Sequence, residues 1–219
     1  MSQWVNFDFE RPPRSLVSQF ARVPTGILSD CLNRMQAMDS GIAPLRPGTR
    51  CCGPAFTVQS VESNNWGAHQ ALTLARRGDV LVIAARGGRH SAVWGHVMTV
   101  AARRGGLAGV VVDGCIRDSA QNRADKLPIF ARGSCPAGPH KAWPCNLNVP
   151  IACAGVPVLP GDLIVGDDDG VVVVPAARAR QVLEEARERM QMEKQWYRKL
   201  KSGASTVSLL GIKPLRRPR

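Results

Sequence analysis

The hydrophobic residues of this chain follow two repeating patterns that alternate along most of its length. Helical spacing covers three segments, which are residues 15–35 with a break near Pro24, residues 66–76 and residues 91–104. Apolar runs typical of buried strands lie between and after them, at residues 51–61, 80–85, 109–114 and 128–133. Strands that alternate with helices predict a parallel sheet with helices packed on it.

The last third of the chain has a different pattern. Residues 133–148 are rich in Gly and Pro and predict a long loop, whereas residues 149–175 contain short apolar runs separated by glycines. These runs predict strands in a second, antiparallel sheet, and an amphipathic helix is expected over residues 177–200. The whole pattern predicts the α/β class, as a layered sandwich of mixed parallel and antiparallel sheets with flanking helices.

We expect one domain, at residues 15–176, with three appended segments. Residues 1–14 contain Pro12-Pro13 and predict an extended arm, residues 177–203 form a terminal helix, and residues 204–219 form a basic tail. At about 1.5 Å per residue the helix is about 35 Å long, which is more than a domain of this size needs. We therefore expect it to pack on another subunit, and the tail to be disordered or to lie on a neighbour.

Composition narrows the classes of function. The 219 residues are 44% hydrophobic and 21% charged, which is typical of a soluble globular protein. No apolar run has the roughly 18 residues of a membrane helix, so we expect no membrane partner. The N-terminus lacks a basic start followed by an apolar stretch, so we expect no secretory signal and a cytoplasmic protein.

Charge and cysteine content exclude further classes. The net charge of +12 is concentrated near the C-terminus, where residues 176–219 hold twelve Lys and Arg against four Glu. Aromatic residues are not interleaved with the basic ones in the way that stacks bases, so nucleic acid is not an expected partner. The seven cysteines include no CxxC pair and are expected to be free, buried thiols rather than zinc ligands or disulfides.

Two features near residues 95 and 117 give the strongest chemical signal. Gly95 lies near a predicted helix start, where a ligand can approach backbone N–H groups that favour a carboxylate. Arg117 and Asp118 closely follow a predicted buried strand, and ligands of α/β sheets collect at the carboxyl ends of strands. Arg can bind a carboxylate through two parallel hydrogen bonds, and Asp can hold a hard divalent cation. The alternative is that both residues cap the next helix and pair on the surface.

Several stretches of the chain resemble one known family. They are, in order, RRGDVLVIAARGG, AVWGHVMTVAARRGGLAGVVVDGCIRD, FARGSCPAGP and NVPIACAGVPVLPGDLIVGDDDGVVVVP, followed by the closing helix. Over residues 15–200 the sequence resembles the RraA-like family. That family includes class II pyruvate aldolases acting on 4-hydroxy-4-methyl-2-oxoglutarate and 4-carboxy-4-hydroxy-2-oxoadipate, and a regulator that inhibits ribonuclease E. The resemblance implies a swivelling β/β/α fold.

The resemblance also implies roles for individual residues. Arg117 would bind the carboxylate of the pyruvyl half of the substrate, and Asp118 would be the direct ligand of Mg²⁺ or Mn²⁺. The backbone that would complete the substrate site belongs to Gly95, His96, Val97 and Met98. The aldolases also take a Glu from the closing helix of a neighbouring subunit. Glu193 is the nearest candidate for it, with Gln191 and Glu188 as alternatives.

The sequence departs from the family at one position of the site. The aldolase signature is an acidic residue, twenty further residues and then Arg-Asp, and here the acidic position is His96. The acidic residue holds a metal-bound water in such enzymes. A neutral imidazole can accept a hydrogen bond from that water, whereas a protonated one would repel the cation. We expect His96 to act with Arg117 and Asp118 in catalysis, with an altered metal affinity and rate.

The implied activity is that of a lyase that cleaves a 4-hydroxy-2-oxo dicarboxylic acid to pyruvate and a second 2-oxo acid. Oxaloacetate decarboxylation is implied as a side activity of the same site, and the assembly is expected to be a homotrimer or hexamer. The alternative is a non-catalytic regulator that binds a ribonuclease or another protein. That regulator lacks the metal-site Asp, whereas Asp118 is present here; His96 and the basic C-terminal region fit the regulator better.

Two other motifs have simpler interpretations. Asp167-Asp168-Asp169-Gly170 lacks the spacing of a calcium loop and predicts a polar turn between strands. Cys115 is close enough to Arg117 to line the site, but no partner base is evident that would make it a nucleophile.

Overall fold

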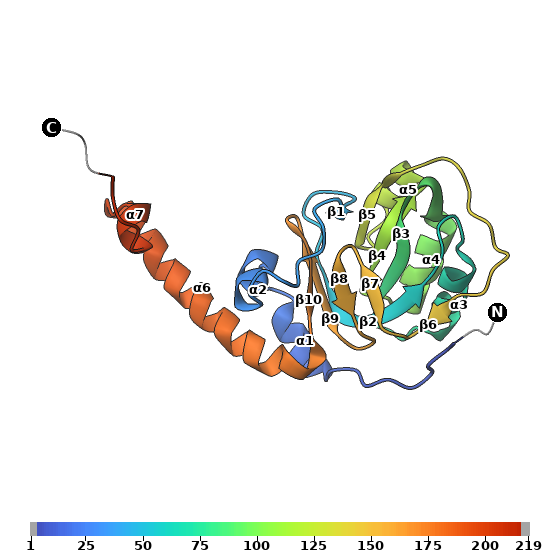
Figure 1. The fold of residues 1–219 in the computed structure, drawn as a ribbon, viewed down its shortest axis with the longest axis horizontal. Helices are drawn as coiled ribbons and strands as arrows, with labels where there is room; N and C mark the ends of the chain where they lie inside the picture. The colour runs from blue at the N-terminus through green and yellow to red at the C-terminus, as the bar shows by residue number, and fades with distance from the viewer. Residues whose placement is uncertain (1–3, 216–219) are drawn as a thin grey trace.

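The computed structural model describes residues 4–215 of the chain. At its centre lie four parallel strands in the spatial order β5-β4-β3-β2, namely β2 (Cys51–Gln59), β3 (Val80–Trp94), β4 (Gly109–Ile116) and β5 (Ile129–Ser134) (Figure 1). The connections between them run through α3 (Trp66–Leu74), α4 (His96–Gly105) and α5 (Ser119–Ala124). The short β1 (Ala43–Pro44) pairs antiparallel with β5. The predicted alternation of strands and helices is confirmed.

The antiparallel strands join this sheet through β2. The strand β9 (Leu163–Asp167) pairs with residues 51–54 of β2, and β10 (Gly170–Val174) pairs with β9. The far end of β2 pairs with β6 (Asn146–Leu147). The expectation of a separate antiparallel sheet is therefore wrong for β9 and β10, because β2 is long enough to pair with β9 through its first half and with β3 through its second. It is confirmed only for two short strands that pair with each other. Within residues 4–215, the strands apart from this sheet are the hairpin β7 (Ile151–Cys153) and β8 (Val156–Val158).

Successive side chains of a strand point to opposite faces of the sheet, and here both faces of β10 are buried, so the molecule is layered. In β10, Val171 and Val173 face a hydrophobic cluster shared with the parallel sheet, whereas Val172 and Val174 face a cluster on the opposite side. That opposite side packs against three helices, α1 (Arg14–Phe20), α2 (Thr25–Cys31) and α6 (Ala179–Lys201). A third cluster lies between the parallel sheet and the helices α3 and α4. The predicted layered α/β sandwich with flanking helices is confirmed.

The main correction to the predicted elements concerns residues 86–95. The sequence predicts a strand that ends at Gly87-Gly88 and a helix over residues 91–104, but β3 continues to Trp94 and α4 begins at His96. After shifts in register, Ala92 and Trp94 pair with residues of β4, and the Trp94 side chain becomes fully buried. Pairing and burial outweigh the local helical pattern here, because strand and helix preferences are weak compared with tertiary packing.

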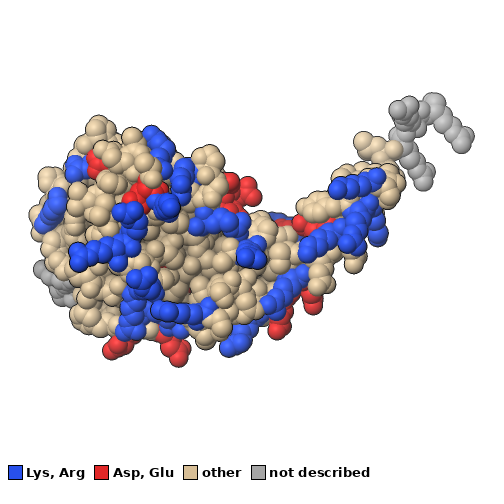
Figure 2. All heavy atoms as spheres, turned by 180° about the vertical axis from the view of Figure 1, so that it is seen from behind, with Lys and Arg blue, Asp and Glu red and all other residues tan. Residues whose placement is uncertain are grey.

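The helix α6 leaves the body of the molecule. Val182, Leu183 and Ala186 in its first half are buried against the body, whereas its second half projects away from it (Figure 1). The short α7 (Thr206–Leu209) follows, so part of the predicted tail is helical. The rest of that predicted tail, residues 216–219, lies outside the described residues. Lys and Arg side chains follow the projecting segment in the space-filling view (Figure 2).

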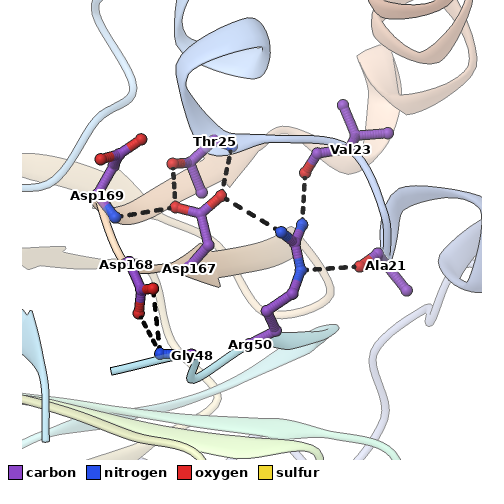
Figure 3. Close-up of polar contacts among 8 residues, drawn as sticks. All are labelled: Ala21, Val23, Thr25, Gly48, Arg50, Asp167, Asp168 and Asp169. Atoms are coloured by element: carbon purple, nitrogen blue, oxygen red, sulfur yellow. Dashed lines mark hydrogen bonds and ion pairs between the residues drawn. The ribbon is translucent and has the colours of Figure 1, made fainter. Parts of the chain in front are cut away.

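The acidic motif at residues 167–170 is a polar turn, as predicted. Asp167 accepts hydrogen bonds from the N–H and the hydroxyl of Thr25, at 2.9 and 2.5 Å, and lies 3.8 Å from the Arg50 guanidinium (Figure 3). Asp168 accepts a hydrogen bond from the N–H of Gly48 at 2.8 Å. These contacts tie the β9–β10 turn to the segments before α2 and β2, so the carboxylates stabilise the fold.

All seven cysteines are free thiols, as predicted, but the prediction that they are buried holds for only four of them, Cys51, Cys115, Cys145 and Cys153. Burial raises the pKa of Cys145 to about 11 and that of Cys52 to about 12, so both thiols stay protonated at neutral pH. In residues 4–215, none of the helices combines the length and hydrophobicity needed to cross a lipid bilayer.

Candidate active site

The two features that the sequence analysis singled out lie next to each other in the fold. The strands β3 and β4 are parallel neighbours, so their carboxyl ends meet at one edge of the sheet. Trp94 pairs with Ile116, and the N–H of Arg117 donates a hydrogen bond to the Trp94 carbonyl at 2.9 Å. Gly95 therefore lies beside Arg117 and Asp118, where α4 begins.

Asp118 points toward the start of α4. The N–H of His96 donates a hydrogen bond to Oδ2 of Asp118 at 3.0 Å. Asp118 has a left-handed backbone, with φ +57° and ψ +42°, a conformation that Asp tolerates better than most residues. Although Asp118 directly precedes α5, its side chain makes no capping hydrogen bond to that helix. The alternative is therefore wrong in that this carboxylate does not cap the next helix, whereas the ion pair with Arg117 that it also proposed is present.

Gly95 makes this close approach possible. A Cβ atom at this position would lie 2.9 Å from Oδ2 of Asp118 and 3.3 Å from Nε of Arg117. Any side chain at residue 95 would therefore push the Asp118 carboxylate away from the first turn of α4.

A cavity of about 180 Å³ opens at this edge of the sheet. Its walls include five of the residues predicted for the site, namely Gly95, Val97, Met98, Arg117 and Asp118. Nε of Arg117 lies 3.8 Å from Oδ2 of Asp118, and the two side chains are 47% and 37% exposed. A ligand in the cavity can therefore reach both a guanidinium and a carboxylate.

Three further polar residues line this cavity, and the sequence analysis did not identify them. Asn65 directly precedes α3, His69 lies one turn later, and Lys141 comes from the loop before β6. Burial and the nearby Lys141 lower the pKa of His69, which favours a neutral ring. The spacing of four residues between Asn65 and His69 was a usable signal, because it places them on one face of a helix. Lys141 could not be identified from helix or strand spacing, because it belongs to a loop rich in Gly and Pro.

That loop is fixed over the cavity by backbone hydrogen bonds. The N–H of Asn65 donates to the carbonyl of His140 at 3.1 Å, and the N–H of Ala92 donates to the carbonyl of Ala137 at 2.8 Å. Segments that are far apart in the sequence thus form one wall, which explains why local patterns did not reveal it.

His96 is not among the residues that line the cavity. Its backbone contacts Asp118, but its ring turns toward the end of α5, where Nε2 lies 3.9 Å from Oδ2 of the buried Asp125. The same carboxylate lies 3.6 Å from Nε of Arg103. His96, which stands where the aldolases have an acidic residue, therefore contributes its backbone N–H to the site and not its side chain.

The donor set suits a water-rich divalent cation. The described residues contain no cluster of three or more His, Cys, Asp or Glu side chains that could enclose a metal, so a closed zinc or calcium site does not fit. Asp118 offers one partly exposed carboxylate at the cavity, of which Oδ2 is engaged by the N–H of His96. Mg²⁺ and Mn²⁺ fit such a site, because hard cations of this kind bind through one or two carboxylates and keep several waters.

Two other predicted residues lie away from the cavity. Cys115 is buried, and its burial raises the pKa of its thiol, with a smaller contribution from the neighbouring Cys135. A raised pKa disfavours a nucleophilic role. Glu193 lies on the projecting half of α6, where it accepts a hydrogen bond from the Tyr197 hydroxyl at 3.2 Å and lines a different cavity. Within the chain, Glu193 is not among the residues that line the cavity at Arg117.

A larger cleft, of about 800 Å³, lies between the N-terminal arm and the start of α6. It is lined largely by proline and aliphatic side chains. Both carboxylate oxygens of its buried Asp162 accept backbone hydrogen bonds, from Leu159 and Ala176. This cleft contains none of the residues that the sequence analysis assigned to the site.

Comparison with known proteins agrees with the fold. The model of the RraA-like family, described as Aldolase/RraA, matches residues 25–173. The chain belongs to the RraA-like family. A protein of Halalkalibacterium halodurans named "Putative 4-hydroxy-4-methyl-2-oxoglutarate aldolase" is 42% identical over 173 residues, which are 79% of this chain and 82% of the relative.

Solved structures of RraA-like proteins have the same fold. Streptomyces coelicolor RraAS2, described as an unusual member of the RNase ES inhibitor RraA protein family, matches with a TM-score of 0.80 and 35% identity, covering 87% of this chain and 99% of that one. An uncharacterized protein from Pseudomonas syringae pv. tomato matches with a TM-score of 0.81 and 31% identity, covering 92% and 99%. Relatives of this RraA-like chain thus include proteins named as aldolases and as ribonuclease inhibitors.

Proposed function

We propose that this protein is a divalent-metal-dependent aldolase that cleaves a 4-hydroxy-2-oxo dicarboxylic acid to pyruvate and a second 2-oxo acid. The observation that carries the proposal is the placement of Arg117, Asp118 and the start of α4 around one cavity. In that arrangement the Arg117 guanidinium can bind a substrate carboxylate, and the adjacent Asp118 carboxylate can bind a metal ion. The name of the Halalkalibacterium halodurans relative supports the same substrate class.

Each residue has a distinct role in the proposed reaction. Arg117 binds the carboxylate of the pyruvyl half through parallel hydrogen bonds, and Lys141 is a second cationic group for the distal carboxylate. The first turn of α4 directs its N–H groups toward the negatively charged end of the substrate. Among them, the N–H of Val97 makes no hydrogen bond to a backbone carbonyl of the described residues.

Asp118 would hold Mg²⁺ or Mn²⁺, and the bound ion would supply Lewis-acid stabilisation of the negative charge that develops on the oxo acid. A water in the cavity takes the proton of the 4-hydroxyl as the C3–C4 bond breaks, the electron pair of that bond stays with the pyruvyl fragment, and a proton from the water then adds to C3 to give pyruvate. Decarboxylation of oxaloacetate leaves the same fragment, so we propose it as a side activity of this site.

We further propose that the active form is a trimer or hexamer in which α6 of a neighbouring copy brings Glu193 to the cavity. The support is the projection of α6 away from its own body, which leaves the end of this helix beside only the short α7 and the residues that follow it in the described part of the chain (Figure 1).

A second candidate function is that of a regulator that binds a ribonuclease or another protein without turnover. It is favoured by His96 at the position of the acidic residue, by the basic side chains along α6, and by the description of the Streptomyces coelicolor relative. Under that function, substrate turnover is absent.

Pyruvate release distinguishes the two functions. The protein is incubated with Mg²⁺ and either 4-hydroxy-4-methyl-2-oxoglutarate or oxaloacetate, and pyruvate is measured with and without a chelator. The aldolase proposal predicts release that the chelator abolishes and added Mg²⁺ restores. Turnover that is absent, or insensitive to the chelator, across several 2-oxo diacids would contradict it.

A further inference from the structure

A closed ring of hydrogen bonds joins four residues next to the cavity. The indole Nε1 of Trp94 donates to Oγ1 of Thr99 at 2.8 Å, and this hydroxyl donates to Oδ1 of Asn122 at 2.7 Å. Nδ2 of Asn122 donates to the carbonyl of Arg117 at 2.7 Å, and the N–H of Arg117 donates back to the Trp94 carbonyl at 2.9 Å. Trp94, Thr99 and Asn122 are each at most 1% exposed, so bulk water does not compete for their hydrogen bonds.

The chemistry of two members fixes the direction of this ring. An indole N–H can only donate a hydrogen bond, and a backbone carbonyl can only accept one. The Thr99 hydroxyl therefore accepts from Trp94 and donates to Asn122. The Asn122 amide must turn its oxygen to Thr99 and its nitrogen to Arg117, because a flipped amide would place its oxygen against the Arg117 carbonyl.

The carbonyl that Asn122 holds belongs to the peptide bond between Arg117 and Asp118. The orientation of that planar peptide sets ψ of Arg117 and φ of Asp118. Asp118 has φ +57°, a left-handed conformation that costs free energy for any residue other than Gly and that surrounding contacts must stabilise. In this conformation Oδ2 of Asp118 accepts the hydrogen bond from the N–H of His96. The hydrogen bond from Asn122 thus supports the backbone conformation that keeps the carboxylate at the cavity.

We infer that Asn122 is a positioning residue, which holds the Arg117–Asp118 peptide so that the Asp118 carboxylate is in place to bind a divalent ion. The inference rests on the metal site of the proposed function. Without the hydrogen bond from Asn122, Asp118 also adopts the commoner backbone conformations, in which its carboxylate leaves the start of α4. A metal ion then binds only the fraction of molecules that keep the left-handed conformation. The apparent affinity falls by that fraction, whereas the metal-bound form is unchanged.

The test compares the wild type with Asn122→Ala and Thr99→Val. Asn122→Ala removes the donor to the Arg117 carbonyl, whereas Thr99→Val keeps that donor, has nearly the same shape and breaks two other hydrogen bonds of the ring. Mg²⁺ affinity is measured by calorimetric titration in the presence of oxalate, kcat by pyruvate release from oxaloacetate at saturating Mg²⁺, and stability by thermal unfolding.

We expect Asn122→Ala to weaken Mg²⁺ binding about tenfold, the effect of one lost hydrogen bond, and to change kcat at saturating Mg²⁺ by less than about twofold. Thr99→Val should change both quantities by less than about twofold, although both variants should melt at a lower temperature than the wild type. Asn122→Ser, whose hydroxyl is one bond shorter than the amide, should lose the same Mg²⁺ affinity, which keeps the test decisive if Asn122→Ala does not fold.

The outcomes separate this inference from the proposed function. Unchanged Mg²⁺ affinity in Asn122→Ala, or an equal loss in Thr99→Val, would mean that the ring only stabilises the fold, and the positioning role would be wrong while the aldolase function stands. A lower kcat at saturating Mg²⁺ with unchanged affinity would also overturn the positioning role. If the wild type binds Mg²⁺ and oxalate without any turnover, the proposed function fails, and the affinities still decide the positioning role. If the wild type binds no Mg²⁺, both fail.

Discussion

Arg117 can be removed with little cost to the fold, because its side chain is half exposed and its ion pair with Asp118 is long, at 3.8 Å. Charge-assisted bidentate hydrogen bonds to a carboxylate are among the strong ones. We therefore expect Arg117→Ala to weaken the binding of oxalate or pyruvate by about a hundredfold or more, with an unchanged melting temperature. Calorimetric titration measures the first and thermal unfolding the second. Arg123→Ala, which removes an exposed arginine of α5, is the matched control, and equal binding by both variants would argue against the assigned site.

The His96 position allows a gain-of-function test. An Asp there would add a second carboxylate at the first residue of α4, whose N–H already contacts Asp118. We expect His96→Asp to raise the affinity for Mg²⁺, measured by titration with the metal alone. His90→Asp, an exposed change on β3, controls for the added negative charge. A lower affinity in His96→Asp would mean that His96 has a role outside the family pattern.

The sequence could predict only part of the site at this scale. Gly95, Arg117 and Asp118 were identifiable because each stands at the end of a strand or the start of a helix, where local patterns are informative. Lys141 was not, since it reaches the cavity from a loop that is distant in the chain. The spacing of Asn65 and His69 was a usable signal for a shared helix face, but it did not show that this face lines the cavity. The outward turn of the His96 ring depends on Asp125, which is 29 positions further along and whose proximity no spacing rule indicates.

At the scale of elements, the junction of β3 and α4 forms the site, and Gly95 controls that junction. Gly95→Ala would place a methyl group 2.9 Å from Oδ2 of Asp118. We expect this change to weaken both oxalate and Mg²⁺ binding by roughly tenfold or more, because the carboxylate must move. Gly105→Ala, at the other end of α4 with nothing within 4 Å of the added atom, should leave binding unchanged and stability equal or slightly higher. Unchanged binding in Gly95→Ala would show that the close approach does not matter.

The junction also explains the main error in predicting elements. Residues 91–94 fit an amphipathic helix by spacing alone, yet they complete β3 because β4 offers a partner strand for them. Whether a partner strand is available depends on how the whole sheet is assembled, and not on residues 91–94 themselves. The helix begins five residues later than predicted, and this shift decided which residues line the cavity. A local pattern could not determine it.

The β9–β10 turn gives a stability prediction at the same scale. Asp167 is buried and accepts three hydrogen bonds, from Thr25 and from the N–H of Asp169. Asp167→Ala leaves those donors unpaired, so we expect the free energy of unfolding to fall by about 2–4 kcal/mol, measured by urea titration. Asp169→Ala, at an exposed position of the same turn, should change it by less than about 0.5 kcal/mol. Equal effects would mean that the turn is held by its backbone alone.

At the scale of the whole molecule, α6 links the site to assembly. Val182, Leu183 and Ala186 anchor its first half, whereas Tyr197 in its second half is more than half exposed in the single chain. We expect the wild type to have three or six times the mass of one chain in light scattering. Tyr197→Glu combined with Leu200→Glu should reduce that mass while the body stays folded, and Lys194→Glu should not. A monomeric wild type would contradict the proposed role of Glu193.

The most direct test of the central claim is calorimetric titration of the wild type with oxalate, with and without Mg²⁺, repeated for Asp118→Ala. If Arg117 and Asp118 hold an oxo acid and a divalent ion in one cavity, Mg²⁺ should raise the affinity for oxalate at least about tenfold in the wild type and have no effect in Asp118→Ala. Oxalate affinity that is the same with Mg²⁺ and with a chelator, or that keeps its response to Mg²⁺ after Asp118→Ala, would contradict the account.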